Sequence, residues 1–207
     1  MALRLGGSGR TEPMFVTRRA YLRAPRLNDW PAWAELRHAS RDFLMPWEPA
    51  WAPDALGRAA YRRRLRRLAR DESEDIGYAY FVFRREDDAL LGGITLSNLQ
   101  RGAAQSATIG YWIGRPHAGQ GYMTESLGAL LDHAFGPFGM HRLEAACMPE
   151  NARSKKLLER CGFRQEGYAR QYLRINGVWH DHLLFALLAG DFRAAADLSL
   201  GVTGVGR

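Results

Sequence analysis

The sequence predicts one mixed α/β domain whose sheet is partly antiparallel. Apolar residues follow a strand period in runs such as residues 78–83 and a helical period from Tyr122 onward. Asn176-Gly177 separates two further strand-like runs, a pattern typical of a β-hairpin, which pairs antiparallel strands. With 207 residues, 46% of them hydrophobic, the chain is large enough to bury one core.

The predicted elements begin with a strand and two helices. Residues 1–14 and 198–207 are expected to form flexible tails around a domain of residues 15–197. Residues 16–23 are predicted as the first strand, and Asn28 or Asp29 as the N-cap of a helix that continues to Ser40. Residues 43–51 form a loop rich in aromatic residues and proline. Asp54 is predicted to cap a second helix, residues 55–70, in which residues 61–70 include six arginines.

The second half of the chain is predicted to combine strands with two more helices. The third helix begins at Tyr122, and the fourth spans residues 152–161 before Gly162, a residue suited to the end of a helix. The predicted strands are residues 78–83, 90–99, 107–113, 142–148, 163–175 and 178–188.

The composition argues against a membrane-spanning protein, a secreted protein and a disulfide scaffold. No apolar run reaches the roughly 18 residues of a membrane-spanning helix, and residues 1–10 lack the apolar centre of a secretion signal. The two cysteines, Cys147 and Cys161, argue against a disulfide scaffold and predict a cytoplasmic protein without a membrane partner. The net charge of +7 allows an anionic partner such as a nucleotide cofactor, RNA or a ribonucleoprotein.

The predicted strand-to-helix junction at residues 115–124 is suited to binding an anion. Gly119 and Gly121 let the backbone approach a phosphate group closely, and the helix that follows begins with free N–H groups. The third glycine of a dinucleotide fingerprint is absent, and so is the Gly-Lys-Ser/Thr of a P-loop, so neither NAD binding nor ATP hydrolysis is indicated. An ordinary turn between a strand and a helix explains the same glycines.

A second candidate segment, residues 148–154, precedes the fourth predicted helix. Asn151 is placed to cap that helix, and Ser154 falls on one helical face with Leu157, Leu158 and Cys161. A serine at such a position is either a buried hydroxyl bonded to the backbone or a reacting group, and its position in the sequence leaves both alternatives open.

Together these segments resemble the GCN5-related N-acetyltransferases (the GNAT family), and specifically their RimJ branch. The resemblance extends from about residue 21 to residue 191. It is carried by Tyr111-Trp-Ile, Gly119-Gln-Gly-Tyr-Met-Thr-Glu, His141-Arg-Leu-Glu, Met148-Pro-Glu-Asn-Ala-Arg-Ser and residues 157–182. It implies the GNAT fold, a mostly antiparallel sheet that splays between its fourth and fifth strands and has flanking helices. It also implies an enzyme that moves an acetyl group from acetyl-CoA to an amine without a metal. RimJ-type enzymes acetylate the N-terminal alanine of a ribosomal protein, so such a protein is the expected partner.

The resemblance also implies which residues bind acetyl-CoA. Its pantetheine arm would insert beside Trp112 and Ile113, with Asn151 in contact with the arm and Ser154 near the sulfur atom. Pro116 stands where the family signature has Gln or Arg, which leaves the backbone as the main phosphate binder. The expected phosphate cradle consists of Gly119, Gln120, Gly121, Tyr122, Met123 and Thr124.

For catalysis, the resemblance implies Ser154 as the donor of a proton to the leaving thiolate and Glu144 as the base. Glu144 aligns with the base of RimI enzymes, but it is equally explained as a solvated strand residue. The acid of RimI aligns with Leu158 and the base of RimL with Gln171, and neither of these side chains can carry out that step.

The amine acceptor is expected to bind at Trp47, Glu48, Trp51 and Tyr172, although the aromatic members of this set could simply fill the core. Two alternatives to a protein N-terminus stay open: a small amine such as a polyamine or an aminoglycoside, and a non-catalytic module that binds acetyl-CoA and RNA. The arginine-rich helix could contact the ribosome or RNA, or could be a solvated face. His180 and His182 stand two residues apart without a third ligand, so no metal site is predicted.

Overall fold

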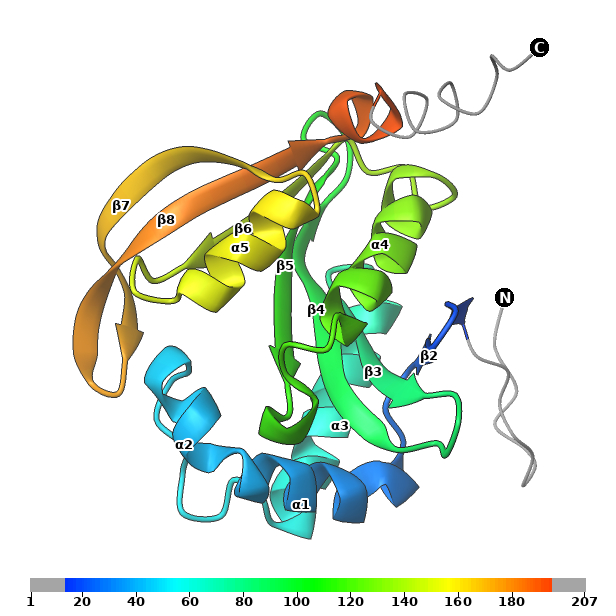
Figure 1. Ribbon diagram of the computed structural model, residues 1–207, viewed down its shortest axis with the longest axis vertical. Helices are drawn as coiled ribbons and strands as arrows, with labels where there is room; N and C mark the ends of the chain where they lie inside the picture. Colours follow the sequence, from blue (N-terminus) through cyan, green and yellow to red (C-terminus); the bar gives the residue numbers. More distant parts are fainter. Residues whose placement is uncertain (1–13, 195–207) are drawn as a thin grey trace.

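A single mixed sheet forms the centre of the protein (Figure 1). The computed structural model describes residues 14–194, so nearly all of both expected tails lies outside the described residues. Within this range the strand order is β1-β2-β3-β4-β5-β6-β8-β7, and every neighbouring pair is antiparallel except β5 and β6, which are parallel. The strands are β1 Phe15–Val16, β2 Ala20–Arg23, β3 Tyr78–Arg84, β4 Leu90–Gln100, β5 Ser106–Ile113, β6 Arg142–Cys147, β7 Arg164–Ile175 and β8 Val178–Leu188.

Helices cover both faces of this sheet. The α-helices are α1 Trp30–Ala39, α2 Arg41–Leu44, α3 Arg58–Ser73, α4 Tyr122–Phe135 and α5 Ala152–Arg160, and short 3-10 turns occur at Leu27–Asp29, Met45–Trp47 and Arg115–His117. In Figure 1, α4 and α5 lie in front of the strands, whereas α3 lies behind β3 and β4. No helix in the described part of the chain is both long and apolar enough to cross a membrane.

Each face of the sheet has its own core, which fixes the helices on that face. On the α4 face, Leu127 and Leu130 are fully buried against strand residues such as Ile94. On the other face, Trp33 of α1 and Tyr61 of α3 pack together with ring centroids 4.9 Å apart. The helical period from Tyr122 onward therefore predicted the buried face of α4 correctly.

The sheet opens between β5 and β6, as the resemblance implied for the fourth and fifth predicted strands. The two strands pair only at their first residues, Ser106 with Arg142, Ala107 with Leu143 and Thr108 with Glu144. Beyond this point β5 pairs only with β4, and β6 only with β8. One edge of β5 is therefore free to accept another extended group.

Three of the predicted elements differ in the structure. The second helix begins at Arg58 with Gly57 as its N-cap, because residues 52–57 form turns in which the Asp54 carbonyl accepts the Gly57 N–H. The strand predicted at residues 16–23 is broken into β1 and β2 by a turn that the Thr17 side chain closes on Ala20. The loop predicted at residues 43–51 includes the end of α2 and a 3-10 turn that contains Pro46.

Candidate active site

The start of α4 has the geometry of an anion-binding cradle. Gly119 and Gly121 have φ angles of 76° and 83°, in the left-handed region that glycine adopts without strain. Gly121 is the N-cap of α4, and its carbonyl accepts the Glu125 N–H at 3.1 Å. The N–H groups of residues 122–124 precede that first bond and have no acceptor within the helix, so they are available to a phosphate group.

Arg19, near the start of the chain, contacts this cradle and stabilises it. Arg19 donates from Nη1 to the Gln120 carbonyl at 3.1 Å, and its guanidinium lies 4.6 Å from the centre of the Tyr122 ring. Its Nε and its backbone N–H both donate to the Glu125 carboxylate, at 2.8 and 2.7 Å. Burial alone would raise the pKa of Glu125, but hydrogen bonds from Thr17 and Arg19 outweigh it and lower the pKa.

Three side chains of the cradle, those of Gln120, Tyr122 and Met123, are engaged elsewhere. Tyr122 and Met123 are buried in the core on the α4 face. Gln120 Nε2 donates to the Pro116 carbonyl at 2.8 Å, and Thr124 is half-buried. For Gln120, Tyr122 and Met123, the backbone is therefore the part that remains available to a phosphate group.

Trp112 and Ile113 lie on the part of β5 that β6 does not pair with. The Trp112 ring packs edge-on against Phe81 at 6.4 Å, and Ile113 packs against the core on the opposite face. Because both side chains are held by packing, the free strand edge beside them presents backbone groups to a ligand.

Two hydroxyl groups join the two sides of the opening. Tyr111 on β5 and Ser154 on α5 form a hydrogen bond, with Oη and Oγ 2.7 Å apart. The Ser154 N–H donates to Asn151 Oδ1 at 3.1 Å, so Asn151 is the N-cap that its position predicted. Burial raises the pKa of Tyr111, which keeps its hydroxyl protonated. The pair therefore offers hydroxyl hydrogen-bond donors to an atom bound between β5 and α5.

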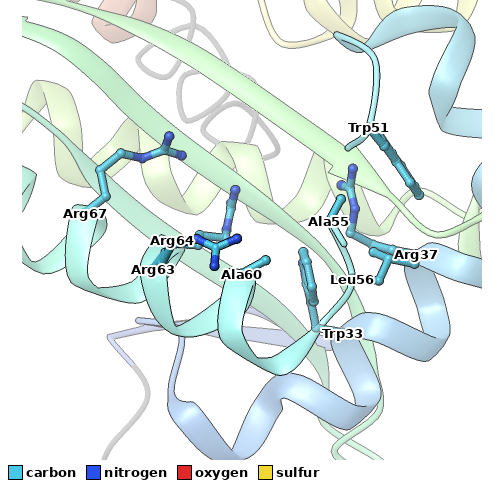
Figure 2. Close-up of a pocket in the computed structure, with 9 residues that line it drawn as sticks. All are labelled: Trp33, Arg37, Trp51, Ala55, Leu56, Ala60, Arg63, Arg64 and Arg67. Atoms are coloured by element: carbon cyan, nitrogen blue, oxygen red, sulfur yellow. The ribbon is translucent and has the colours of Figure 1, made fainter. Parts of the chain in front are cut away.

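A cleft of about 620 Å³ lies on the opposite face of the sheet, and we call it the acceptor cleft. Its walls come from α1, from the segment after α2, from α3 and from β3 to β5, and they include the backbone around Tyr111. An adjoining pocket of about 430 Å³, shown in Figure 2, shares Arg37, Trp51, Arg64 and Arg67 with it.

The residues predicted to bind the acceptor divide into two groups. Glu48 and Trp51 line the acceptor cleft, whereas Trp47 and Tyr172 are not among its wall residues. Tyr172 is 48% exposed and meets the ring of His182 edge-on at 5.6 Å. Trp47, at the end of a 3-10 turn, is 36% exposed.

Glu48 is already neutralised by partners in the protein. Arg37 forms an ion pair with its carboxylate, and Trp51 Nε1 donates to Glu48 Oε2 at 2.8 Å. Arg37 in turn lies 4.4 Å from the Trp51 ring centre and 5.0 Å from that of Trp112. The expected attraction between a free Glu48 and an ammonium group is therefore reduced, because the carboxylate fixes Arg37 in the wall.

Glu144 lies on the same face of the sheet as the acceptor cleft, which we call the acceptor face, but it is not one of the wall residues of the cleft. Its neighbours Leu143 and Ala145 are buried in the core on the α4 face, so the alternation of the strand directs Glu144 to the other side. Arg142 Nε donates to its carboxylate at 2.7 Å, and the side chain is 48% exposed. Glu144 thus takes part in a surface ion pair within reach of solvent.

Other positions singled out in the sequence have structural partners. Leu158 is fully buried, and the N–H of Gln171 donates to Asp181 Oδ1 at 2.7 Å. Within residues 14–194 no three His, Cys, Asp or Glu side chains are grouped as metal ligands. Asp181, between the two histidines, also accepts a hydrogen bond from the Tyr168 hydroxyl.

Comparison with known proteins identifies this arrangement. Residues 19–164 match the family model described as the acetyltransferase (GNAT) domain. The chain belongs to the GNAT family of acetyltransferases. It is an acetyl-CoA-dependent N-acetyltransferase.

Relatives from several bacteria share nearly the whole GNAT domain. The "Probable N-acetyltransferase YjcK" of Bacillus subtilis (strain 168) is 36% identical over 171 residues, which are 83% of this chain and 94% of that protein. The [Ribosomal protein uS5]-alanine N-acetyltransferase of Escherichia coli (strain K12) is 34% identical over 168 residues, 80% of this chain and 87% of that protein. The structure of Mycobacterium smegmatis RimJ in complex with CoA-disulfide superposes with a TM-score of 0.78 at 32% identity, covering 86% of this chain and 89% of that one.

The residues of this GNAT domain fit its acetyl donor. The left-handed glycines, the free N–H groups of α4 and the nearby Arg19 suit a pyrophosphate, and the unpaired edge of β5 suits an amide-containing arm. The sequence did not indicate Arg19, Arg37 or Tyr111 as site residues. Tyr111 stood within a family segment, but its hydroxyl partner is 43 positions away and left no local signal.

Proposed function

We propose that the protein acetylates the α-amine of a protein N-terminus, with alanine favoured as the first residue, by direct transfer from acetyl-CoA in a ternary complex. A ribosomal protein is the acceptor we favour, because the Escherichia coli and Mycobacterium smegmatis relatives carry ribosomal-protein and RimJ names. Such an acceptor agrees with the cytoplasmic location that the two unpaired cysteines favour.

One observation carries the proposal of direct transfer. The acceptor cleft reaches the backbone of β5 at residues 110–112 from one face of the sheet, and the Tyr111–Ser154 pair lies on the other face. An amine in the cleft and a thioester sulfur beside the hydroxyl pair would meet at the unpaired edge of β5. This geometry supports attack by the amine on the thioester carbonyl with no acetylated residue in between.

In the proposed reaction the C–N bond forms as the C–S bond breaks. The amine loses a proton, and the leaving thiolate takes one from Ser154, which is hydrogen-bonded to Tyr111. A backbone N–H at the free edge of β5 is available to stabilise the carbonyl oxygen as negative charge develops on it. Because an α-amine has a pKa near 7.7–8.0, a base must remove its proton at neutral pH. Glu144, on the acceptor face, is our candidate to accept that proton through water.

The walls of the acceptor cleft favour this acceptor over the two alternatives. Arg64 and Arg67 line the cleft beside the Arg37–Glu48 ion pair, and their positive charges oppose a polycation such as a polyamine or an aminoglycoside. Against a module that only binds acetyl-CoA and RNA, the protonated hydroxyl pair supplies an acid in place of the residue lost at Leu158.

A peptide library tests the proposed acceptor. Peptides that differ only in the first residue are incubated with the enzyme and acetyl-CoA, and mass spectrometry locates each acetyl group. The expected result is acetylation of the α-amine, fastest with alanine first. Faster acetylation of a polyamine, an aminoglycoside or lysine side chains would contradict the proposal.

A further inference from the structure

Two arginines in the wall of the acceptor cleft have no hydrogen-bond or ion-pair partner among the residues that the structure describes. Arg64 and Arg67 lie on α3 and both line the cleft, together with Leu68 and Asp71 at the helical spacing of one face. Neither guanidinium forms a hydrogen bond or an ion pair with any residue in the described range 14–194. Figure 2 shows Arg64 and Arg67 projecting from α3, with Arg37 on the neighbouring α1.

The cleft holds more positive charge than its own carboxylates neutralise. The Nε of Arg64 is buried without an acceptor, and burial together with the charges of Arg37 and Arg67 lowers the pKa of Arg64. Of the two carboxylates in the walls, Glu48 is already paired with Arg37. The other, Asp71, lies 3.7 Å from Arg70, outside the cleft walls. Arg64 as a whole is half-buried, and Arg67 is exposed in the cleft wall. A partly buried cation without a nearby counter-charge is unfavourable, and an anion that entered the cleft would stabilise it.

The surrounding side chains strengthen the interaction with such an anion. Arg37 is held beside three tryptophan rings, at 5.8 Å from Trp33, 4.4 Å from Trp51 and 5.0 Å from Trp112. The Nε1 of Trp33, in the adjoining pocket, is a second buried donor without an acceptor. The Arg37 side chain is only 13% exposed among these rings, and charge interactions are stronger where less water surrounds the charges.

The same cleft extends from these arginines to the backbone of β5 around Tyr111. An acceptor whose amine lies at β5 would therefore place its following residues along α3. We propose that Arg64 and Arg67 bind an acidic side chain of the acceptor peptide, so that the enzyme selects N-termini that carry Glu or Asp shortly after the acetylated residue. This inference rests on the proposed function and adds a second element of specificity to it.

A matched set of peptides tests the inference. All begin with alanine, and they carry either Glu or Gln at position two, three or four, with the other residues unchanged. For the wild type, kcat/KM should be at least about tenfold higher for Glu than for Gln at one of these positions, and the preference should weaken as salt is added. The double variant Arg64→Gln/Arg67→Gln should lose the preference.

Two controls separate this effect from a general change in the protein. Arg66→Gln alters an exposed arginine of the same helix that is not a wall residue, and it should keep the preference. The double variant should bind acetyl-CoA with unchanged affinity and should unfold at the same temperature or a higher one, because it removes the partly buried, unpaired charge of Arg64.

The outcomes of these experiments distinguish failure of the inference from failure of the proposed function. Equal rates for Glu and Gln peptides, or a preference that survives in the double variant, would overturn the inference and leave the proposed function intact. If no alanine peptide is acetylated, the proposed function fails and the inference with it. If a short RNA binds the wild type and not the double variant, while Glu and Gln peptides react equally, the arginines serve RNA and the inference is wrong.

Discussion

The hydrogen bond between Tyr111 and Ser154 leads to a quantitative prediction for catalysis. Ser154→Ala removes the hydroxyl that we propose as the proton donor to the leaving thiolate. Among the described residues, Tyr111 then keeps only the Ser154 carbonyl, 3.5 Å away, as a hydrogen-bond partner. A positioned general acid contributes at least about a hundredfold to a rate, which corresponds to about 2.7 kcal/mol of activation free energy. We therefore expect kcat to fall by about a hundredfold or more while the Kd for acetyl-CoA changes little.

The companion variant Tyr111→Phe shows whether the two hydroxyls act as a unit. If Tyr111 works only by supporting Ser154, then the double variant should be no slower than Ser154→Ala alone. Stability should follow a different order. Ser154→Ala leaves the Tyr111 hydroxyl without a good partner and should lower the free energy of unfolding by about 1–3 kcal/mol, and the double variant should recover part of that loss.

Steady-state kinetics with a peptide acceptor and thermal unfolding of the four proteins measure both effects. The rates must be compared well below the lowest unfolding temperature in the set. Unchanged kcat in Ser154→Ala would refute the role of Ser154 as the acid and leave water as the donor. Losses that multiply in the double variant would show that the two hydroxyls act independently.

Three further predictions follow from the cradle and from the buried ion pairs. Gly121→Val should weaken acetyl-CoA binding at least about tenfold by calorimetry, whereas Gly139→Val, also at a left-handed glycine but far from the cradle, should keep the affinity. The folded protein lowers the pKa of Glu125, so the ionised carboxylate stabilises the fold above its unfolded pKa of about 4.3, and this contribution is lost as the pH falls through the folded pKa. In Glu125→Gln the free energy of unfolding should therefore depend less on pH in that range, and an identical pH dependence would contradict this. Asp29→Ala removes the partner of Arg23 in a buried ion pair and should lower the free energy of unfolding in urea by about 3–5 kcal/mol, against less than about 1 kcal/mol for Asp87→Ala in an exposed pair.

The elements of the fold were largely predictable because their signals are local. Periodicity and the turn residue Gly162 gave the bounds of α5 to within one residue, and Asn151 was correctly identified as its cap. The errors came from competing local interactions. Asp54 has a capping side chain, but the chain turns once more and α3 starts after Gly57, while the Asp54 carboxylate accepts a hydrogen bond from Arg63.

The backbone cradle of the candidate site could be predicted from the sequence, whereas the contacts of the site that join distant parts of the chain could not. The backbone cradle depends on consecutive residues, and its glycines are visible in the sequence. The bond from Arg19 to Glu125 spans 106 positions, and no local pattern marks it. Glu48 was predicted to attract an ammonium group, but its carboxylate is paired with Arg37, eleven positions earlier on a different element. Only the packing of α1 against the following segment reveals this ion pair.

The central claim is direct transfer of the acetyl group to a peptide α-amine, and intact mass spectrometry tests it most directly. The enzyme is incubated with acetyl-CoA alone and then with an alanine-starting peptide, and the masses of enzyme and peptide are recorded over time. We predict one acetyl group on the α-amine of the peptide and none on the enzyme at any time. An acetylated enzyme that forms before the peptide is added, and then passes its acetyl group to the peptide, would contradict the account.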